Sequence, residues 1–296
     1  MGRTTLYPMV QFKKDTWEIN EFEVASMFLL VGSEKSMLID TGIGIGDLKA
    51  AVRAITDKPL IVVLTHNHGD HAGNARQFDE IWLNPKDAGL MPIPESVEKR
   101  RSDAALIKLR QYDSVGSGMF TAFPIAGFDL ETDIVEPDEP MPVIHDLTDG
   151  MEFDLGGGRI IKAYECPGHT PGQMMFLDEY TRSLFVGDAL NYNLGLGSVP
   201  ASESLKYLMK MQELSDRYDG IYNGHHDFRG LGAPLGKDCL PNATDLCRQL
   251  VDGRYRPCLV PSFWGPASGR PPRVMIIKER NFIGFRGLEL DKVVKM

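Results

Sequence analysis

The sequence predicts an α/β protein, because strand patterns alternate with helical patterns in both halves of the chain. Residues 60–64 form an unbroken apolar run rich in β-branched side chains, which is typical of a strand buried on both faces. Helical patterns at 47–55, 202–218 and 237–251 each lie next to such strands. The chain has 296 residues, of which 43% are hydrophobic, and no linker divides it. We therefore expect a single domain over residues 1–296.

The first strands lead to an aspartate. Residues 10–22 read as a strand pair, and 25–31 and 36–39 as two further strands joined by a Gly-Ser-Glu-Lys turn. The last of them ends at Asp40. Asp40 is either a turn or helix-cap residue, or it hydrogen-bonds a metal ligand from behind.

A cluster of metal-binding side chains follows the apolar strand at 60–64. His66, His68, Asp70 and His71 lie within six residues. In an extended segment His66 and His68 point the same way, and Asp70 and His71 then aim at a second point as the chain turns. Three of the seven histidines of the chain are in this cluster, which argues against an ordinary polar loop. Imidazoles with a carboxylate suit divalent metals, zinc first.

Later strands repeat the same theme, since each ends at a histidine or an aspartate. The strand at 159–165 leads to His169 between two Pro-Gly pairs, 184–186 leads to Asp188, and 220–223 leads to His225 and His226. If these strand ends converge, they gather one metal site. The chain closes with a strand or hairpin at 271–286.

Residues 91–142 interrupt this pattern and are interpreted as an insertion. A helix is expected at 95–112, with the basic residues 99–101 on a solvated face. Glycine- and phenylalanine-rich residues and an acidic, proline-rich run follow. Long insertions are often lids. We expect Phe120 and Phe123 to contact substrate, with plain core packing as the alternative.

Charge and cysteine use restrict partners and location. The 41 acidic and 32 basic residues give a net charge of −9, which argues against a general nucleic-acid binder. The first twenty residues lack an apolar core, and no run reaches membrane-spanning length. Four cysteines without CxxC spacing indicate reduced thiols. We expect a cytoplasmic enzyme with a small-molecule substrate, no nucleic-acid or membrane partner, and monomer or homo-oligomer left open.

Five segments together resemble the metallo-β-lactamase superfamily: Leu-Ile-Asp-Thr-Gly at 38–42, His-Asn-His-Gly-Asp-His at 66–71, Gly-His-Thr-Pro-Gly at 168–172, Gly-Asp at 187–188 and Gly-His at 224–225. The resemblance implies an αββα four-layer sandwich of two mixed β-sheets with metals at one edge. It also implies that His66, His68 and His169 bind a first metal, that Asp70, His71 and His225 bind a second, and that Asp188 bridges them.

The bridging aspartate favours particular branches of this superfamily. Some zinc β-lactamases have a cysteine near position 188, and others lack the aspartate. An intact Asp188 resembles the glyoxalase II, lactonase and phosphodiesterase branches. Lactonases place a tyrosine three residues past this aspartate, where the chain has Asn191 followed by Tyr192. Tyr192 is therefore a weak candidate for a substrate contact. His226 is either a surface neighbour, a substrate contact or an alternative ligand.

The resemblance implies a dinuclear zinc hydrolase of an ester, lactone or thioester, with iron or manganese as alternative ions. Two dications about 3.5–4 Å apart share one water and lower its pKa towards neutrality, which supplies a bridging hydroxide. Asp70 and Asp188 are the expected catalytic carboxylates. The alternatives are a phosphodiesterase or β-lactam hydrolase on the same two metals, or a persulfide dioxygenase with a single iron.

Overall fold

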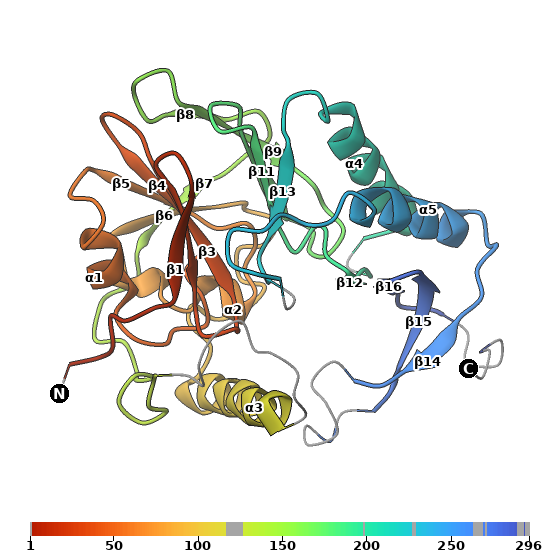
Figure 1. Cartoon of the computed structure of the whole chain (residues 1–296), viewed down its shortest axis with the longest axis horizontal. Helices are drawn as coiled ribbons and strands as arrows, with labels where there is room; N and C mark the ends of the chain where they lie inside the picture. Colours follow the sequence, from red (N-terminus) through yellow and green to blue (C-terminus); the bar gives the residue numbers. More distant parts are fainter. Residues whose placement is uncertain are drawn as a thin grey trace.

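Two mixed β-sheets lie at the centre of the molecule with helices outside them (Figure 1). The computed structural model describes residues 2–116, 127–197, 199–226, 229–262, 269, 271–288 and 293, without the side chains of 113–116. The first sheet has the order β1-β2-β3-β4-β5-β6-β7, antiparallel up to β4 and parallel from there. Its strands are β1 Met9–Lys13, β2 Thr16–Asn20, β3 Ser26–Val31, β4 Ser36–Ile39, β5 Leu60–Val63, β6 Glu80–Leu83 and β7 Val143–Asp146.

The second sheet has the order β13-β11-β10-β9-β8. Only β11 and β13 are parallel in it. Its strands are β8 Glu152–Asp154, β9 Ile160–Glu165, β10 Met174–Asp178, β11 Ser183–Gly187 and β13 Gly220–Asn223. The parallel pairs β4–β5 and β11–β13 bring the carboxyl ends of these strands to one edge of each sheet, which is where the sequence places its histidines and aspartates.

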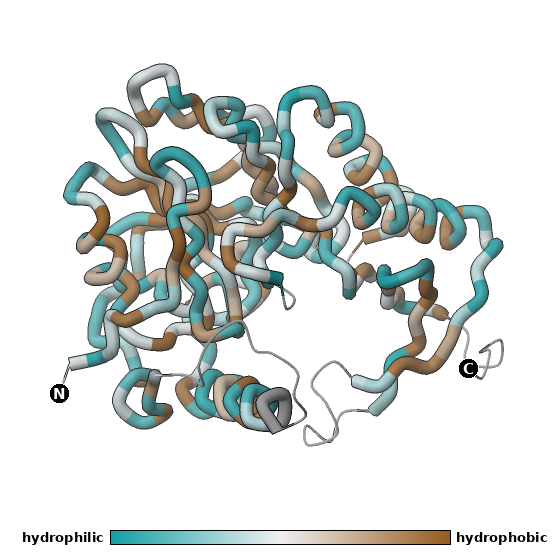
Figure 2. The backbone as a smooth tube through the Cα atoms, in the orientation of Figure 1, coloured by the Kyte–Doolittle hydropathy of each residue, from teal (hydrophilic) through white to brown (hydrophobic). Residues whose placement is uncertain are grey.

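Alternating side chains of the strands produce three apolar layers. On β3, Leu29 faces outward into a cluster with Leu48 of α1 (Leu48–Arg53). Its neighbour Phe28 faces inward and meets Phe185 of the second sheet, with ring centroids 4.8 Å apart. The outer face of the second sheet packs on α4 (Ala201–Glu213) and α5 (Cys239–Val251). Hydrophobic residues gather where these layers meet (Figure 2). The expected αββα sandwich is confirmed.

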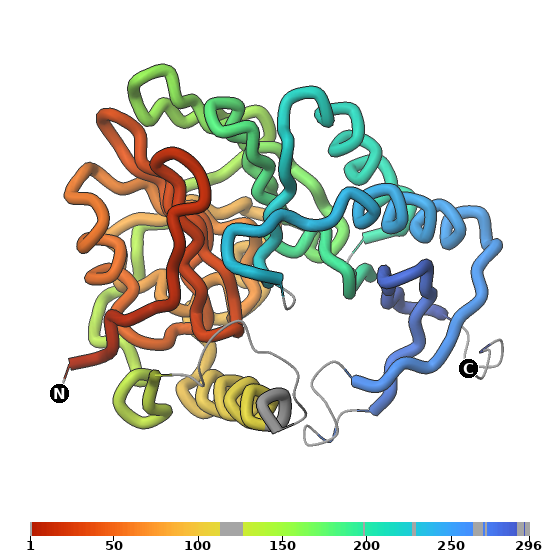
Figure 3. Tube along the Cα trace, in the orientation of Figure 1, coloured from red at the N-terminus to blue at the C-terminus, as the bar shows by residue number. Residues whose placement is uncertain are grey.

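A third sheet extends this sandwich and was not predicted beyond a hairpin. It has the order β12-β16-β15-β14, built from β12 Asn193–Gly195, β14 Cys258–Val260, β15 Arg273–Lys278 and β16 Asn281–Gly284. β16 pairs in parallel with β12, which follows closely after Asp188. The blue C-terminal strands lie far from the red N-terminal strands along the longest axis (Figure 3). The parallel β12–β16 pairing therefore joins the end of the chain to the edge that carries the metal-binding motifs.

The described part of the insertion packs as core. Its helix α3 (Val97–Gly116) contributes Ala104 and Ile107 to the outer cluster of the first sheet. The expectation of a solvated basic face was wrong for Arg100, which is 2% exposed and donates hydrogen bonds to Gly44 O at 3.2 Å and Val135 O at 2.7 Å. Phe120 and Phe123 lie outside the described residues.

Two short helical segments follow the histidine loop. They are α2 (Gly69–Ala72) and the 3-10 turn η1 (Ala75–Gln77). α2 starts directly after His68, so Asp70 and His71 already lie on helical turns. No helix in the described part of the chain is long and apolar enough to cross a membrane.

A buried carboxylate holds the turn after Asp40. Glu21 is fully buried and accepts hydrogen bonds from the backbone N–H groups of Ile43, Gly44 (3.0 Å) and Ile45 (2.8 Å). Burial raises the pKa of Glu21 from 4.5 to about 7, although these donors lower it. The carboxylate thus fixes three consecutive backbone N–H groups at the cost of being desolvated.

The protein is expected to lose stability as the pH rises from 4.5 to 7 because of Glu21. The folded state binds a proton more tightly than the unfolded state, so the contribution of Glu21 is complete below pH 4.5 and is lost as the pH passes the folded pKa of about 7. The loss is on the order of 3 kcal/mol at most. Urea unfolding at several pH values gives the free energy of unfolding of the wild type and of Glu21→Gln. This free energy should fall less steeply with rising pH in the variant. An equal pH dependence in the two proteins would contradict this role.

Candidate metal centre

Five chain segments deliver histidines and aspartates to one place. His66 and His68 follow β5, and Asp70 and His71 lie on α2. The other three residues follow strands of the second sheet: His169 after β9, Asp188 after β11 and His225 after β13. These side chains form three overlapping groups, in each of which the candidate ligand atoms lie within 4.8 Å of one another: His66, His68 and His169; His66, His71 and Asp188; and Asp70, His71 and His225.

The first group is formed by three imidazoles. The Nδ1 atom of His68 lies 3.1 Å from Nε2 of His66 and 2.9 Å from Nε2 of His169. Two nitrogens bound tetrahedrally to one zinc at about 2.0–2.1 Å would be roughly 3.3 Å apart. The observed spacing is close to that value, so the three nitrogens fit a shared metal ion.

The group of Asp70, His71 and His225, called the second group from here on, adds a carboxylate. Oδ2 of Asp70 lies 3.5 Å from Nε2 of His225 and 3.9 Å from Nε2 of His71. His71 is completely buried, whereas the side chain of Asp70 is 33% exposed. The group therefore has one open corner, at Asp70, from which a ligand can approach.

Asp188 lies between the two groups. Its Oδ2 is 3.6 Å from Nε2 of His169, a member of the first group. Its Oδ1 is 3.4 Å from Nε2 of His225 and 3.7 Å from Nε2 of His71, which belong to the second. Within the described residues, Asp188 Oδ1 and His71 Nε2 are buried without a hydrogen-bond partner. Buried polar atoms normally have one, so a cation between these residues fits the donor set.

Hydrogen bonds on the far side of each ring orient the imidazoles. Nδ1–H of His169 donates to Gly195 O and that of His225 donates to Val24 O, at 2.9 and 2.8 Å. Nδ1–H of His71 donates to Asp40 Oδ2 at 2.9 Å. In the neutral ring these bonds place the proton on Nδ1, so Nε2, which is directed at the cluster, is the nitrogen that can bind a metal.

Asp40 also reaches the ring of His66. It accepts hydrogen bonds from the backbone N–H and the hydroxyl of Thr65, at 2.7 and 2.8 Å. The Thr65 oxygen lies 3.0 Å from Nδ1 of His66. One buried carboxylate therefore orients a histidine in each group, which is the role that the sequence analysis offered as the alternative to a simple turn residue. Asp40 has a positive φ of 63°, as a tight turn at this strand end requires.

Burial and mutual repulsion keep His66 and His68 neutral. The pKa of His66 lies well below its ordinary value because of burial, then because of His71 and His169. The pKa of His68 falls to about 4 because of burial and then His169. Neutral imidazoles are the form that binds metal, so these two side chains are ready for a cation near neutral pH.

The second group has an excess of negative charge. Burial alone would lower the pKa of His71, but Asp70, Asp40 and Asp188 raise it to about 9. Burial alone would raise the pKa of Asp188, but His225 and His71 hold it well below its ordinary value. The two carboxylates thus stay ionised, and a metal dication would replace the proton as their counter-charge.

Close packing at Gly224 brings β13 against the cluster. A Cβ atom at this position would lie 2.5 Å from Cε1 of His71 and 3.1 Å from Oδ1 of Asp188. Any larger residue would displace one of these side chains. The glycine before His225 is therefore needed for the approach of the three segments.

Asp87 was missed by the sequence analysis, although it follows β6 by only four residues. It is completely buried. Its carboxylate accepts hydrogen bonds from the Thr170 hydroxyl and the Gly172 N–H, both at 2.6 Å. Its carbonyl accepts one from the side chain of Asn67 at 3.3 Å. Asp87 thus braces the turn of His169 against the loop of His66 and His68. Its position shortly after a strand is the one sequence signal it shares with the candidate ligands.

Of the expected substrate residues, the two that the structure describes, Tyr192 and His226, contact segments outside the cluster. The hydroxyl of Tyr192 accepts a hydrogen bond from Gly236 N at 2.8 Å, and Arg280 stacks on its ring with 4.4 Å from Cζ to the centroid. Tyr192 therefore contacts the segment before α5. His226 is 6% exposed and its Nδ1 donates to Arg229 O at 3.0 Å.

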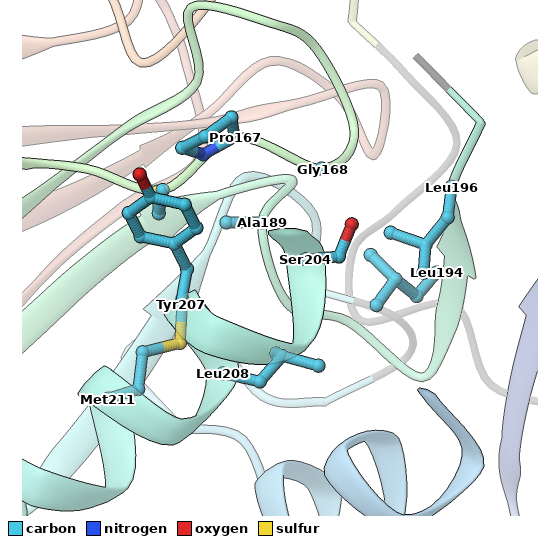
Figure 4. Close-up of a pocket in the computed structure, with 10 residues that line it drawn as sticks. Pro167, Gly168, Ala189, Leu194, Leu196, Ser204, Tyr207, Leu208 and Met211 are labelled. Atoms are coloured by element: carbon cyan, nitrogen blue, oxygen red, sulfur yellow. The ribbon is translucent and has the colours of Figure 1, made fainter. Parts of the chain in front are cut away.

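A small pocket adjoins the metal centre on the side of α4. It encloses about 220 Å³ of space, part of it open solvent. Its lining includes Gly168 and Ala189, which neighbour His169 and Asp188, and the hydroxyl of Ser204, which has no hydrogen-bond partner within the described residues (Figure 4). None of the seven candidate ligands lines it. The pocket therefore lies next to the metal centre without forming part of it.

Comparison with known proteins gives one family. A family model described as "Metallo-beta-lactamase superfamily" matches residues 21–226. Acyl-coenzyme A thioesterase MBLAC2 of Gallus gallus is 26% identical over 207 residues, covering 66% of this chain and 68% of the relative. Hydroxyacylglutathione hydrolase GloC of Haemophilus influenzae is 27% identical over 175 residues, covering 55% and 65%.

Solved structures are similar in fold. A metallo-beta-lactamase from Pontibacter korlensis has a TM-score of 0.54 at 15% identity, covering 82% of this chain and 99% of that one. The sec-alkylsulfatase Pisa1 from Pseudomonas sp. has a TM-score of 0.55 at 16% identity, covering 84% and 42%. At such identities the likeness concerns the arrangement of the chain alone.

Proposed function

Because the chain belongs to the metallo-beta-lactamase superfamily, a superfamily of hydrolases, we propose that it is a metal-dependent hydrolase that cleaves a thioester, ester or lactone of a small molecule. The observation that carries the proposal is the position of Asp188. Its two carboxylate oxygens face two separate groups of histidines, and one of these oxygens is buried without a hydrogen-bond partner in the described chain.

We propose two zinc ions as the native metals. His66, His68 and His169 would hold one, Asp70, His71 and His225 would hold the other, and Asp188 would bridge them. The donor set supports zinc, because His66 and His68 are neutral imidazoles and Asp70 and Asp188 are ionised carboxylates. Such a pair of dications activates a water between them and polarises the bond to be cleaved.

The protein side chains would divide the remaining tasks. Asp188 would hold the two groups at a fixed separation, since it lies close to histidines of both. Asp70 is the most exposed carboxylate of the cluster and lies at its open corner, where it could accept a hydrogen bond from the nucleophile. Asp40 would keep His66 and His71 in the tautomers that metal binding needs.

The relatives favour a thioester among the three bond types. One is named an acyl-coenzyme A thioesterase and another a hydroxyacylglutathione hydrolase. A thiolate is a better leaving group than an alkoxide or amide, so a thioester needs no additional general acid.

Elemental analysis followed by substrate assays tests this proposal. Purified protein should contain about two zinc ions per chain, and it should hydrolyse thioesters faster than lactones, β-lactams or phosphodiesters. Removing the metal with a chelator should abolish turnover, and adding zinc should restore it. A single iron with oxygen consumption on persulfides would instead indicate a dioxygenase. Absence of bound metal would overturn both.

We also propose that the whole chain forms one domain that acts on a small molecule. The pairing of β12 with β16 and the packing of α5 on both β15 and β16 support a single unit. The four cysteines are free and buried, as the proposed reducing location requires.

A further inference from the structure

An arginine of the third sheet lies beside the metal centre. Arg273 begins β15 and is exposed. A Cβ atom placed on Gly195 would lie 3.8 Å from Nη2 of Arg273 and 3.7 Å from Nδ1 of His169. One methyl-sized space therefore separates this guanidinium from a proposed metal ligand.

Bare backbone forms the floor of that space. Gly195 of β12 and Gly284 of β16 are paired across the sheet, and a Cβ on Gly284 would lie 3.1 Å from Nη2 of Arg273. Neither glycine has a positive φ, so the backbone does not require glycine at these positions. Glycine inside a strand weakens it and marks places where a ligand or another chain approaches closely. The two glycines keep the surface between Arg273 and His169 open.

A second arginine lies two residues beyond Gly284. Cγ of Arg286 would be 2.9 Å from a Cβ placed on Gly197, which continues β12 past Gly195. Arg273 and Arg286 form no ion pair or hydrogen bond with any side chain of the described chain, although the protein has 41 acidic residues and a net charge of −9. Within the described residues neither guanidinium has an acidic partner, and Arg273 lies beside His169, so it is available to an anion from outside the chain.

We propose that Arg273, assisted by Arg286, binds an oxyanion of the substrate, a carboxylate or a phosphate, while the bond to be cleaved lies at the metal centre. This inference rests on the proposed hydrolase function and specifies its substrate as anionic. The guanidinium fork matches both oxyanions in two parallel hydrogen bonds. The anion is carried either by the acyl part of the thioester or by its thiol part. In both cases the guanidinium group recognises an oxyanion.

Kinetics on matched thioesters test the assignment. The neutral reference is S-butyryl-N-acetylcysteamine. S-succinyl-N-acetylcysteamine adds a carboxylate to the acyl part, while S-butyryl-glutathione and S-butyryl-coenzyme A add carboxylates or phosphates to the thiol part. In Arg273→Gln, the ratio of KM for an anionic thioester to KM for the neutral one should rise about tenfold or more over the wild-type ratio. The anionic thioester that shows the rise identifies the source of the oxyanion. An unchanged ratio for all three anionic thioesters would overturn the proposal.

Matched variants separate this role from a structural one. Arg256 is exposed and lies just before β14, at the opposite end of the third sheet from Arg273, so Arg256→Gln should leave every ratio unchanged. Arg273→Lys should recover part of the wild-type ratio, because lysine keeps the charge but not the fork. Equal rises in Arg256→Gln and Arg273→Gln would show a general charge effect and contradict a specific site.

A binding measurement keeps the inference separate from the hydrolase proposal. S-methyl-glutathione and S-methyl-coenzyme A cannot be hydrolysed as thioesters, and calorimetry gives their Kd on the metal-loaded protein. If the thiol part carries the oxyanion, at least one of them should bind about tenfold more weakly to Arg273→Gln than to the wild type, and more weakly as salt is added. If the acyl part carries it, succinate should show the same loss of affinity. If that holds without thioester turnover, the proposed reaction fails and the anion site stands. Turnover with an unchanged KM ratio and unchanged Kd would leave the hydrolase and refute the anion site.

Discussion

Asp188→Asn is expected to lower kcat/KM by roughly a thousandfold, which corresponds to about 4 kcal/mol of lost transition-state stabilisation. Asparagine keeps the shape of the side chain but loses the negative charge, and its amide would direct N–H donors at the histidines that lie 3.4 to 3.7 Å from the carboxylate oxygens. At least one of the two metals should be lost. Elemental analysis and steady-state kinetics measure both effects.

Asp219→Asn provides the control for Asp188→Asn. Asp219 immediately precedes β13, far from the end that carries His225, and its exposed side chain pairs with Arg182 at 2.9 Å. Exposed ion pairs contribute little, so this variant should keep full metal content and turnover. Circular dichroism should show that both variants fold. Wild-type turnover in a folded Asp188→Asn protein would contradict the bridging role.

Asp40→Asn is expected to lower the affinity for the second metal by about 10- to 100-fold. The carboxylate of Asp40 accepts from Nδ1–H of His71 at 2.9 Å. An asparagine amide there would donate instead, so His71 would accept at Nδ1 and carry its proton on Nε2, the atom that faces the cluster. A protonated Nε2 cannot bind metal. Titration with zinc in the presence of a competing chelator measures the two affinities separately.

Asp47→Asn is the matched control for this second experiment. Asp47 lies in the same segment and caps α1 by accepting a hydrogen bond from Ala50 N at 2.9 Å, a role that asparagine fills equally well. The affinities of the Asp47→Asn protein for the two zinc ions should equal those of the wild type. Asp40 reaches His66 of the first group only through the Thr65 hydroxyl, so the affinity for the first metal should fall less than that for the second. An equal loss of both affinities in Asp40→Asn would contradict a specific effect on the tautomer of His71.

The sequence predicted the position of the site because metal binding imposes strong local patterns. A histidine or aspartate after each buried strand is visible without coordinates, and the parallel strands then carry these residues to one edge. The carboxylates that hold the neighbouring turns in place leave weaker signals in the sequence. Asp87 and Glu21 are single carboxylates with no motif, and only the structure shows that each holds a turn through backbone N–H groups.

Local patterns therefore indicated an α/β fold and metal-binding side chains at the strand ends, because apolar periodicity and strand-end histidines are properties of neighbouring positions. The αββα sandwich and the division of the seven candidate ligands between two metals came from the resemblance to the metallo-β-lactamase superfamily. Tertiary structure alone decided which partners meet across the chain. The pairing of β12 with β16 places Arg273 beside His169, more than a hundred residues away, and the hydroxyl of Tyr192 faces Gly236. Such contacts depend on register between distant strands, which no short segment of sequence specifies.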